Sequence, residues 1–415
     1  MIIKPFAALR PQVHFVKECA ALPYDVMSSD EARAEVQGKP YSFLHVDKAE
    51  IDLDASVGLY DDIVYQTAAN NLRALEENGV YLQDPTPRFY LYRQVMNSRA
   101  QTGIVACASI DDYIQGKIKK HELTRADKEQ DRTRHVDACS AQTGPIFLAY
   151  KTCKELDEII QSETQNAPLY DFISDDGIGH VVWVTSSKQI DERIQAAFEK
   201  LDALYIADGH HRAASAVKVG SMRREQNPAY NGNEQFNFFM SVIFPADSLK
   251  IFDYNRLLRD LNGMDERQFI AAVENALGKA EVYQGVGQYR PTAPHTLGLF
   301  VGGKWYKVQM KEDICHAEKA ADRLDCAILQ KHLLAPVLGI QDPRTDKRID
   351  FVGGIRGLAY LEERCKQDAV AAISMYPVTM DELTAVADAG EIMPPKSTWF
   401  EPKLRSGIFI HKIEK

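Results

Sequence analysis

The feature that most constrains this chain is an abrupt change from strand-like to helix-like sequence near its middle. Residues 204–206 (Leu-Tyr-Ile) predict a short buried strand, Asp208-Gly209 predicts a tight turn, and the small residues of 210–217 predict a helix that begins close to His210. The first amides of a helix lack partners within it, and the helix dipole is positive there. Gly209 allows close approach of the backbone. The run Asp208-Gly209-His210-His211-Arg212 therefore predicts a phosphate-binding turn.

A purely structural interpretation of this stretch stays open, in which Asp208 only caps the helix and Arg212 forms a surface ion pair. The combination of strand, Asp-Gly, His-His-Arg and small-residue helix resembles the phosphate-binding turn of the ParB/sulfiredoxin-like superfamily. That superfamily includes nucleotide-dependent switches, nucleases and free-serine kinases. No cysteine lies between Cys153 and Cys315, so the turn lacks the cysteine expected of a sulfiredoxin.

A second concentration of polar chemistry lies at 119–135. Thr124 and Asp127 predict the capped start of a helix. Charged residues of that helix recur at a spacing that places them on one face, and His121 and Glu122 stand just ahead of it. The residues of that face are Lys128, Asp131, Arg132 and His135. Such a face is usually solvated. The alternative is that this segment lies beside the Asp-Gly-His-His-Arg turn and contributes a base and cations to one site.

Four motifs resemble the domain-of-unknown-function 1015 family of bacteria and archaea. They are Lys119-Lys-His-Glu-x-Thr124, Ala141-Gln-x-Gly-Pro-Ile-Phe147, Ala207-Asp-Gly-His-His-Arg212 and Met393-Pro-Pro-Lys-Ser-Thr-x-Phe-x-Pro-Lys403. The resemblance spans nearly the whole chain. It implies a ParB/sulfiredoxin-like core and a relation to free-serine kinases.

Composition excludes several classes of protein. Hydrophobic residues make up 45% and charged residues 26% of the 415 residues, which is typical of a globular chain with ample core. The net charge of −10 disfavours nonspecific binding to nucleic acid. No stretch reaches about 18 uninterrupted apolar residues, and the amino terminus lacks a signal-peptide core, so we expect a cytoplasmic protein without a membrane partner. The seven cysteines form no Cys-x-x-Cys pair and are expected to be reduced.

The pattern along the chain predicts an α+β fold, with mixed sheets and flanking helices and with a second α/β lobe after the ParB-like core. A helix is predicted over 61–78, a hairpin over 89–108 and a strand over 42–46. The predicted domain boundary separates an N-terminal lobe, 1–235, from a C-terminal lobe, 236–415. The first predicted strand of the C-terminal lobe begins at Phe238. The sequence leaves open a homodimer.

The predicted function is a kinase that transfers phosphate from ATP or ADP to a small hydroxylated metabolite, with L-serine favoured by the family resemblance. The predicted catalytic residues are Glu122 as base, with His121, His210 and His211. The predicted phosphate and nucleotide contacts are Asp208, Gly209, Arg212, Lys128, Arg132, Lys396, Ser397 and Thr398, and the predicted Mg²⁺ ligands are Asp208 and Asp131. Two alternatives stay open: a ParB-like nucleotide-binding switch without turnover and a metal-dependent nuclease.

Overall fold

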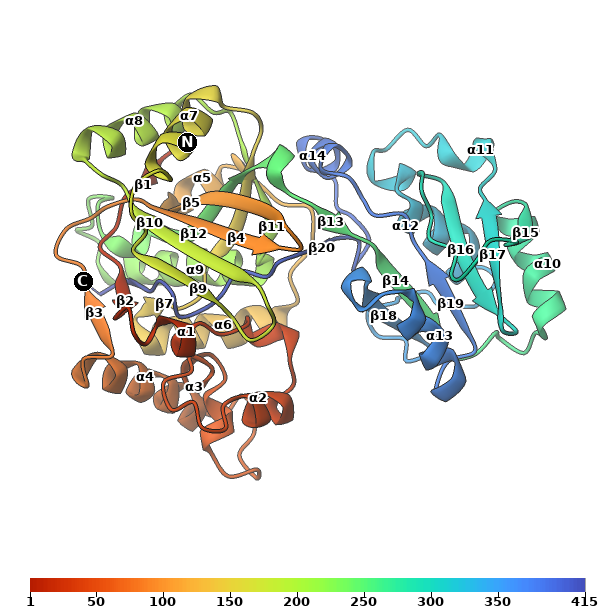
Figure 1. Cartoon of the computed structure of the whole chain (residues 1–415), viewed down its shortest axis with the longest axis horizontal. Helices are drawn as coiled ribbons and strands as arrows, with labels where there is room; N and C mark the ends of the chain where they lie inside the picture. Colours follow the sequence, from red (N-terminus) through yellow and green to blue (C-terminus); the bar gives the residue numbers. More distant parts are fainter. Residues whose placement is uncertain (415) are drawn as a thin grey trace. The chain divides into compact units, whose positions relative to one another are not determined.

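The computed structural model describes residues 1–414 and divides into two compact units. The first unit holds residues 1–249 together with the C-terminal segment that begins at Pro402, and the second holds Lys250–Glu401. Both units combine sheets with flanking helices, so the predicted α+β class with mixed sheets is confirmed (Figure 1). Strand β12 (Phe238–Pro245), predicted to open the second lobe, is instead a central strand of the first unit.

The first unit is built on a nine-stranded mixed sheet with the order β6-β11-β8-β12-β5-β4-β10-β9, and β1 also pairs with β5. Its other strands are β1 (Ile3–Lys4), β4 (Tyr90–Met96), β5 (Arg99–Ser109), β6 (Ile118–Lys119), β8 (Ile146–Tyr150), β9 (Tyr170–Ile173), β10 (Gly179–Val184) and β11 (Leu204–Asp208). Two smaller pairs are β2 (Leu9–Pro11) with β3 (Tyr81–Gln83) and β7 (Ala141–Gln142) with β21 (His411–Lys412). The last pair ties the C-terminal segment to the body of this unit.

The predicted hairpin is confirmed, because β4 and β5 pair in antiparallel register from Tyr90↔Val105 to Met96↔Arg99. Asn97 and Ser98 form its turn with φ of 50° and 64°. Two successive residues at positive φ are what a tight two-residue hairpin turn requires.

Helices cover the first unit on opposite sides (Figure 1). They are α1 (Val16–Cys19), α2 (Ser29–Glu35), α3 (Leu44–Asp47), α4 (Asp62–Glu77), α5 (Ile110–Ile114), α6 (Ala126–Cys139), α7 (Lys154–Glu163), α8 (Lys188–Glu199) and α9 (His210–Gln226). In Figure 1, α7 and α8 lie on one side and α2, α3 and α4 on the other. Residues 42–46, predicted as a strand, instead lead into α3, where Leu44 and Val46 are buried beneath α4.

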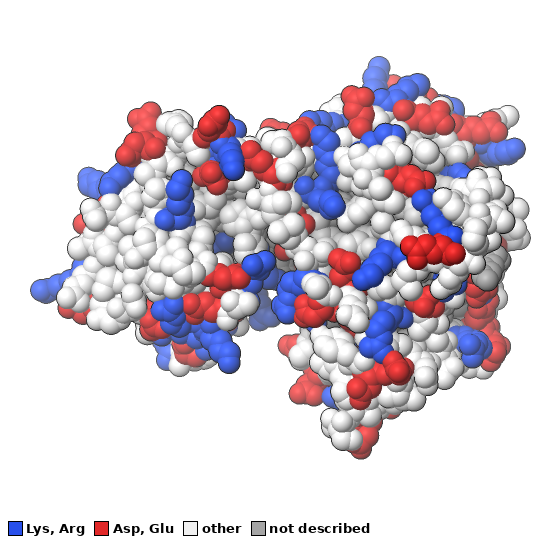
Figure 2. All heavy atoms as spheres, turned by 180° about the vertical axis from the view of Figure 1, so that it is seen from behind, with Lys and Arg blue, Asp and Glu red and all other residues white. Residues whose placement is uncertain are grey.

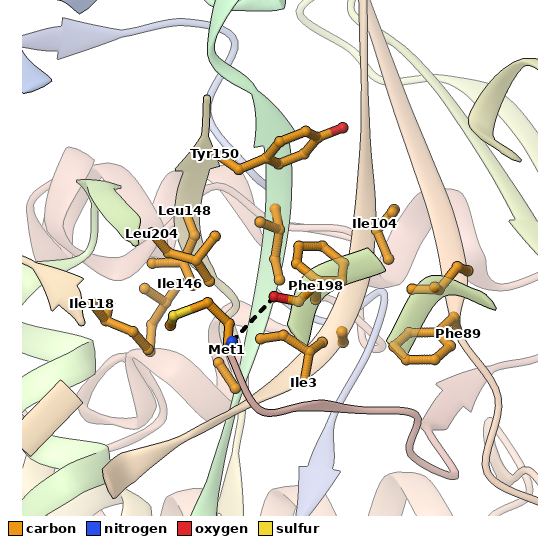
Figure 3. Close-up of a cluster of buried hydrophobic side chains, with 14 of the residues drawn as sticks. Met1, Ile3, Phe89, Ile104, Ile118, Ile146, Leu148, Tyr150, Phe198 and Leu204 are labelled. Atoms are coloured by element: carbon orange, nitrogen blue, oxygen red, sulfur yellow. Dashed lines mark hydrogen bonds between the residues drawn. The ribbon is translucent and has the colours of Figure 1, made fainter. Parts of the chain in front are cut away.

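The apolar core of the first unit lies between its central strands and the helices α7, α8 and α9. Leu148 and Leu204 are fully buried there, as is Phe198 of α8. Figure 3 shows these side chains converging, with the Met1 ammonium group donating a hydrogen bond of 3.1 Å to the Phe198 carbonyl. This core anchors β11 and the start of α9 on a rigid base, because a packed interior permits little displacement.

The second unit has a six-stranded sheet with the order β15-β17-β16-β19-β14-β18. The strands of this sheet are β14 (Tyr254–Leu258), β15 (Ala280–Val282), β16 (Thr296–Val301), β17 (Lys304–Gln309), β18 (Ile349–Gly353) and β19 (Ala371–Ser374). A separate pair is formed by β13 (Ile251–Phe252) and β20 (Trp399–Phe400). Its helices are α10 (Glu266–Ala276), α11 (Glu312–Cys315), α12 (Asp325–Leu329), α13 (Leu358–Gln367) and α14 (Met380–Asp388).

The surface mixes charges of both signs. Figure 2 shows Lys and Arg side chains interspersed with Asp and Glu over the visible face. Among residues 1–414, no helix combines the length and apolar character needed to cross a membrane.

Candidate active site

The strand-to-helix turn has the predicted local structure. Strand β11 is buried through Ala207, and α9 begins at His210, so both the predicted strand and the predicted helix start are confirmed. The register of β11 against β8 shifts between Ile206 and Asp208, an irregularity of the kind that redirects a side chain at the edge of a site. Gly209 has a φ of 90°, and a Cβ there would lie 3.1 Å from the Arg212 Nε. The positive φ is therefore what favours glycine here, and a larger residue would also press on the Arg212 side chain.

Asp208 is held as a carboxylate at this turn. Its Oδ2 accepts a hydrogen bond of 3.1 Å from the Lys403 Nζ, and its Oδ1 accepts one of 2.8 Å from the Gly209 N–H. Burial opposes ionisation, but Lys403 and Arg212 outweigh it and hold the pKa of Asp208 well below its usual range. The carboxylate thus fixes a lysine from the C-terminal segment beside the start of α9.

Arg212 folds back over the turn from the first turn of α9. Its Nη1 donates a hydrogen bond of 2.5 Å to the Pro145 carbonyl and lies beside Gly144. Within residues 1–414, no carboxylate lies within 4.0 Å of this guanidinium to form an ion pair. A partly buried cation without a direct counter-charge favours an anionic ligand.

A small cavity of about 30 Å³ lies behind the turn and is lined by both Arg132 and Arg212, with Tyr24, Asp47 and Thr143. Its size suits a water molecule or two. Thr143 donates a hydrogen bond of 2.7 Å to Asp47, and the Arg132 guanidinium stacks over the Tyr24 ring at 4.1 Å. Burial of Tyr24 raises its pKa, so its hydroxyl stays protonated at neutral pH. Arg132 therefore lies next to the turn, as predicted, but inside the protein.

Asp131 is already engaged by protein groups. Its Oδ1 accepts a hydrogen bond of 2.9 Å from the Tyr65 hydroxyl, and its Oδ2 pairs with Arg132 at 2.9 Å. Its side chain is 7% exposed. A metal ion would have to displace both partners, so this carboxylate is poorly suited to the predicted Mg²⁺ site.

The segment 118–125 lies beside the turn because β6 continues the sheet next to β11. The two strands are parallel, with Leu204 opposite Ile118 and Tyr205 opposite Lys119. The Arg125 backbone N–H donates a hydrogen bond of 3.0 Å to the His211 Nε2. The predicted adjacency of the two polar segments is thus confirmed. The predicted Thr124–Asp127 cap is wrong, because α6 starts after Arg125 without a side-chain cap and Thr124 instead contacts Glu129.

His121 and His210 form a buried pair of neutral imidazoles. Their rings meet edge to face with centroids 4.5 Å apart, and their exposed fractions are 1% and 5%. Burial lowers the pKa of His121 to about 4. Burial is the main cause that holds the pKa of His210 well below its usual range, and the neighbouring His121 lowers this pKa further. Within residues 1–414, the buried His210 Nε2 has no hydrogen-bond partner.

Glu122 is the carboxylate that faces this pair from the outside. Its Oε2 lies 4.0 Å from the His210 Nδ1, and its side chain is 38% exposed. That separation is longer than a hydrogen bond. Glu122 therefore has both access to solvent and a neutral imidazole nearby, which is the environment a general base needs.

The remaining predicted phosphate contacts are Lys128 on α6 and three residues of the second unit. The Lys128 Nζ donates a hydrogen bond of 3.2 Å to the Tyr60 hydroxyl. Lys396, Ser397 and Thr398 belong to the second unit, where the buried Ser397 Oγ donates to the Pro394 carbonyl at 2.6 Å.

Two groups at the turn are missing from the predicted phosphate contacts, although the sequence indicated a basic loop of residues 396–398, Lys403 and Arg405 that could clamp an anion. Lys403 is one, although it ends a family-like motif at the carboxyl end of the chain. The Gly144-Pro145 loop that receives Arg212 is the other. Each belongs to a family-like motif, but only the fold shows that these segments meet at the α9 turn.

The described residues do not form a complete metal centre: within residues 1–414, no group of three His, Cys, Asp or Glu side chains is placed to hold a metal ion. Mg²⁺ in phosphate sites is commonly held by one or two carboxylates, phosphate oxygens and water. Asp208 is the one predicted ligand whose carboxylate lies at the turn.

Residues 3–327 match the family described as "Protein of unknown function (DUF1015)". The chain belongs to this family. A search of the curated proteins finds no match.

Among solved structures, the chain resembles a free serine kinase variant in complex with AMP, at 13% identity and a TM-score of 0.38, over 72% of this chain and 92% of that one. It also resembles SbnI with a C-terminal truncation from Staphylococcus aureus, at 11% identity and a TM-score of 0.39, over 73% and 85% of the two chains. A conserved hypothetical protein from Pyrococcus furiosus matches at 15% identity and a TM-score of 0.37, over 74% and 94%.

Proposed function

We propose that this protein is a kinase that transfers phosphate from ATP or ADP to a hydroxyl group of a small metabolite, with L-serine as the favoured acceptor. The choice of nucleotide and of L-serine comes from the motifs that resemble the family and its free-serine-kinase relations. The choice of phosphate chemistry comes from the α9 turn.

The observation that carries the proposal is the collection of groups at the start of α9. The 17-residue helix directs its N-terminus at the turn, where its dipole favours an anion. Arg212 supplies a guanidinium without a direct carboxylate partner, and Lys403 is held in place by Asp208. Phosphate oxygens would be bound by the first amides of α9 and by these two cations.

The acceptor hydroxyl would be deprotonated by Glu122. The acceptor oxygen forms a new bond to the transferred phosphorus, the bond from that phosphorus to the donor's bridging oxygen breaks, and Glu122 takes the acceptor's proton. His210, neutral and 4.0 Å away, would orient this carboxylate. His121 supports His210 through their ring contact. If Mg²⁺ takes part, Asp208 is the residue that would hold it, and the ion would offset charge on the donor phosphates.

A nucleotide-binding switch without turnover is the second candidate. It needs the same anion-binding turn but no base. The separation of 4.0 Å between the Glu122 Oε2 and the His210 Nδ1 favours it, because a base that His210 orients would lie within hydrogen-bond distance of that imidazole.

A phosphate-transfer screen separates the two candidates. Wild-type protein would be incubated with ATP or ADP and Mg²⁺ against panels of amino acids and polyols, and products would be read by mass spectrometry. A product heavier by one phosphate group, with L-serine among the best acceptors, supports the kinase. Nucleotide binding by calorimetry without any phosphorylated product favours the switch. Absence of nucleotide binding contradicts both.

A further inference from the structure

A second, larger hollow in the first unit shares no lining residue with the α9 turn. It has a volume of about 570 Å³, which falls within the range of about 300–1,000 Å³ typical of small-molecule sites. Its walls come from residues 14–22, from 27–44, from the turn between β9 and β10, and from Arg405 of the C-terminal segment. We call it the Arg405 groove. The proposed kinase chemistry uses none of these residues.

One wall of the Arg405 groove is a fixed and buried guanidinium. The Arg405 side chain is only 4% exposed, pairs with Asp176, and donates a hydrogen bond of 3.2 Å to the Ser174 Oγ. Ser174 in turn donates one of 2.5 Å to Asp176. His180 lies behind this wall, where burial and then Arg405 lower its pKa to about 3, so it adds no charge at neutral pH. The wall is therefore preorganised and close to neutral.

The mouth of the groove carries charges of both signs. Lys39 pairs with Asp175 at 3.0 Å and with Glu35 at 2.7 Å, and Lys17 pairs more loosely with Asp175 at 3.5 Å. The Glu18 carboxylate accepts a hydrogen bond of 2.8 Å from the Tyr41 backbone N–H. Lys17 therefore has donors to spare, and Glu18 has a carboxylate with room for a further donor.

The floor between these charges is apolar. It is lined by Ala20, Ala21, Leu22, Met27 and Leu44. Ala21 and Leu44 belong to the hydrophobic core of this side of the unit, with Met27 packed against it. A ligand that fits must present apolar surface to the floor and charge to the mouth.

We propose that the Arg405 groove binds a small zwitterion with an aliphatic body, an amino acid or a short peptide. Its carboxylate would contact Lys17, its ammonium group would contact Glu18, and its side chain would lie on Leu22, Met27 and Leu44. A nucleotide is a poor fit, because the groove is lined by four carboxylates and three Lys or Arg side chains, so no excess positive charge faces a polyanion. The groove is thus unsuited to the nucleotide that is proposed for the α9 turn.

The test is calorimetric titration of the full-length protein with L-leucine, L-methionine and L-leucyl-L-leucine. L-leucine is compared with 4-methylpentanoate and 3-methylbutylamine, which each keep one of its two charges. We expect at least one zwitterion to bind with a Kd of about 1 mM or tighter. Each single-charge analogue should bind about tenfold or more weakly than L-leucine, because one charge-assisted contact is lost.

Variants connect this binding to the groove. Lys17→Met and Glu18→Gln should each weaken zwitterion binding by about 10-fold or more. Lys188→Met, at a lysine that is 89% exposed on α8, is the matched control and should change nothing. Arg212→Ala should also leave zwitterion binding unchanged. The proposal is overturned if no zwitterion binds, if single-charge analogues bind as tightly, or if neither groove variant matters. None of these outcomes depends on phosphate transfer.

Discussion

The C-terminal segment supplies one cation to each of two regions of the first unit, and the two cations have different surroundings. At the α9 turn, Lys403 pairs with Asp208 while Arg212 beside it has no ion-pair partner among residues 1–414. In the Arg405 groove, Arg405 pairs with Asp176, and the lysines at the mouth pair with Asp175. One region keeps a positive charge without a direct counter-charge, and the other is balanced.

This difference shows that the number of basic residues in a region does not by itself predict an anion-binding site. What matters is the charge that remains after the protein's own carboxylates are satisfied, together with backbone donors such as the start of a helix. By this criterion the α9 turn suits phosphate and the groove suits a ligand of no net charge.

The largest expected effect is on turnover at the α9 turn. Glu122→Gln should lower phosphate transfer by about 10²-fold or more, because the amide cannot accept the acceptor's proton. Nucleotide affinity should stay within a few fold, since Glu122 contacts no phosphate in the proposed arrangement. Steady-state rates and calorimetry on the same preparation give both values. Glu18→Gln is the matched substitution in the Arg405 groove. This variant should transfer phosphate from nucleotide to a polyol acceptor at the wild-type rate. If Glu122→Gln transfers phosphate at the wild-type rate, Glu122 is not the base.

Arg212→Ala should act on binding. Losing a charge-assisted contact to phosphate costs roughly 1.5–3 kcal/mol, or about one to two powers of ten in nucleotide affinity. Lys218→Ala provides a control on the same helix. The Lys218 side chain is 50% exposed, and its ion pair with Glu129 is long, at 4.0 Å. Calorimetry with ADP measures both variants. Equal affinities for the two would show that the unpaired guanidinium does not bind phosphate.

The buried imidazoles predict a pH dependence of stability that belongs to the α9 turn. The folded-state pKa of His121 is about 4, below the ordinary 6.5, so the unfolded chain binds the proton more tightly. The stability that His121 contributes is therefore complete above pH 6.5 and is lost as pH falls towards 4. Between pH 7 and pH 5 this loss is about 2 kcal/mol.

His121→Gln should remove that part of the loss. Urea unfolding at pH 7 and pH 5 measures the loss of global stability. Hydrogen exchange of peptides from β11 and α9 at the same two pH values measures the loss of local stability. His316→Gln, at a histidine that is 72% exposed in the second unit, is the control and should leave the pH dependence of those peptides as it is. An unchanged pH dependence in His121→Gln would mean that the imidazole is not buried neutral.

The α9 turn could be predicted from sequence because its signals are local. An apolar strand, Asp208-Gly209 and a run of small residues determine a strand, a tight turn and a helix start within a few residues. Lys403 could not be placed in the same way. It lies 195 residues from Asp208, and only the pairing of β21 with β7 and the path of the C-terminal segment bring the two together.

Tertiary packing also overrode local preference elsewhere. Residues 42–46 have a strand-like composition, yet Leu44 and Val46 are buried in α3 against α4. Helical spacing correctly grouped Asp131 and Arg132 on α6, but it could not show that they pair with each other inside the protein. The Arg405 groove gave no sequence signal, because its charged residues come from segments far apart in the chain.

The smallest expected effect concerns Lys128, which was predicted from the sequence to contact phosphate. Its Nζ donates to the Tyr60 hydroxyl at 3.2 Å and lies 5.7 Å from the centre of that ring, so its charge is already held by a protein partner. Lys128→Met should therefore change ADP affinity by less than about threefold, as expected for a largely screened charge at a distance. Raising the salt concentration should reduce even this change, whereas the loss in Arg212→Ala should persist. A loss in Lys128→Met as large as that in Arg212→Ala would mean that the phosphate site extends along α6 and that the positive charge of the α9 turn is not confined to Arg212 and Lys403.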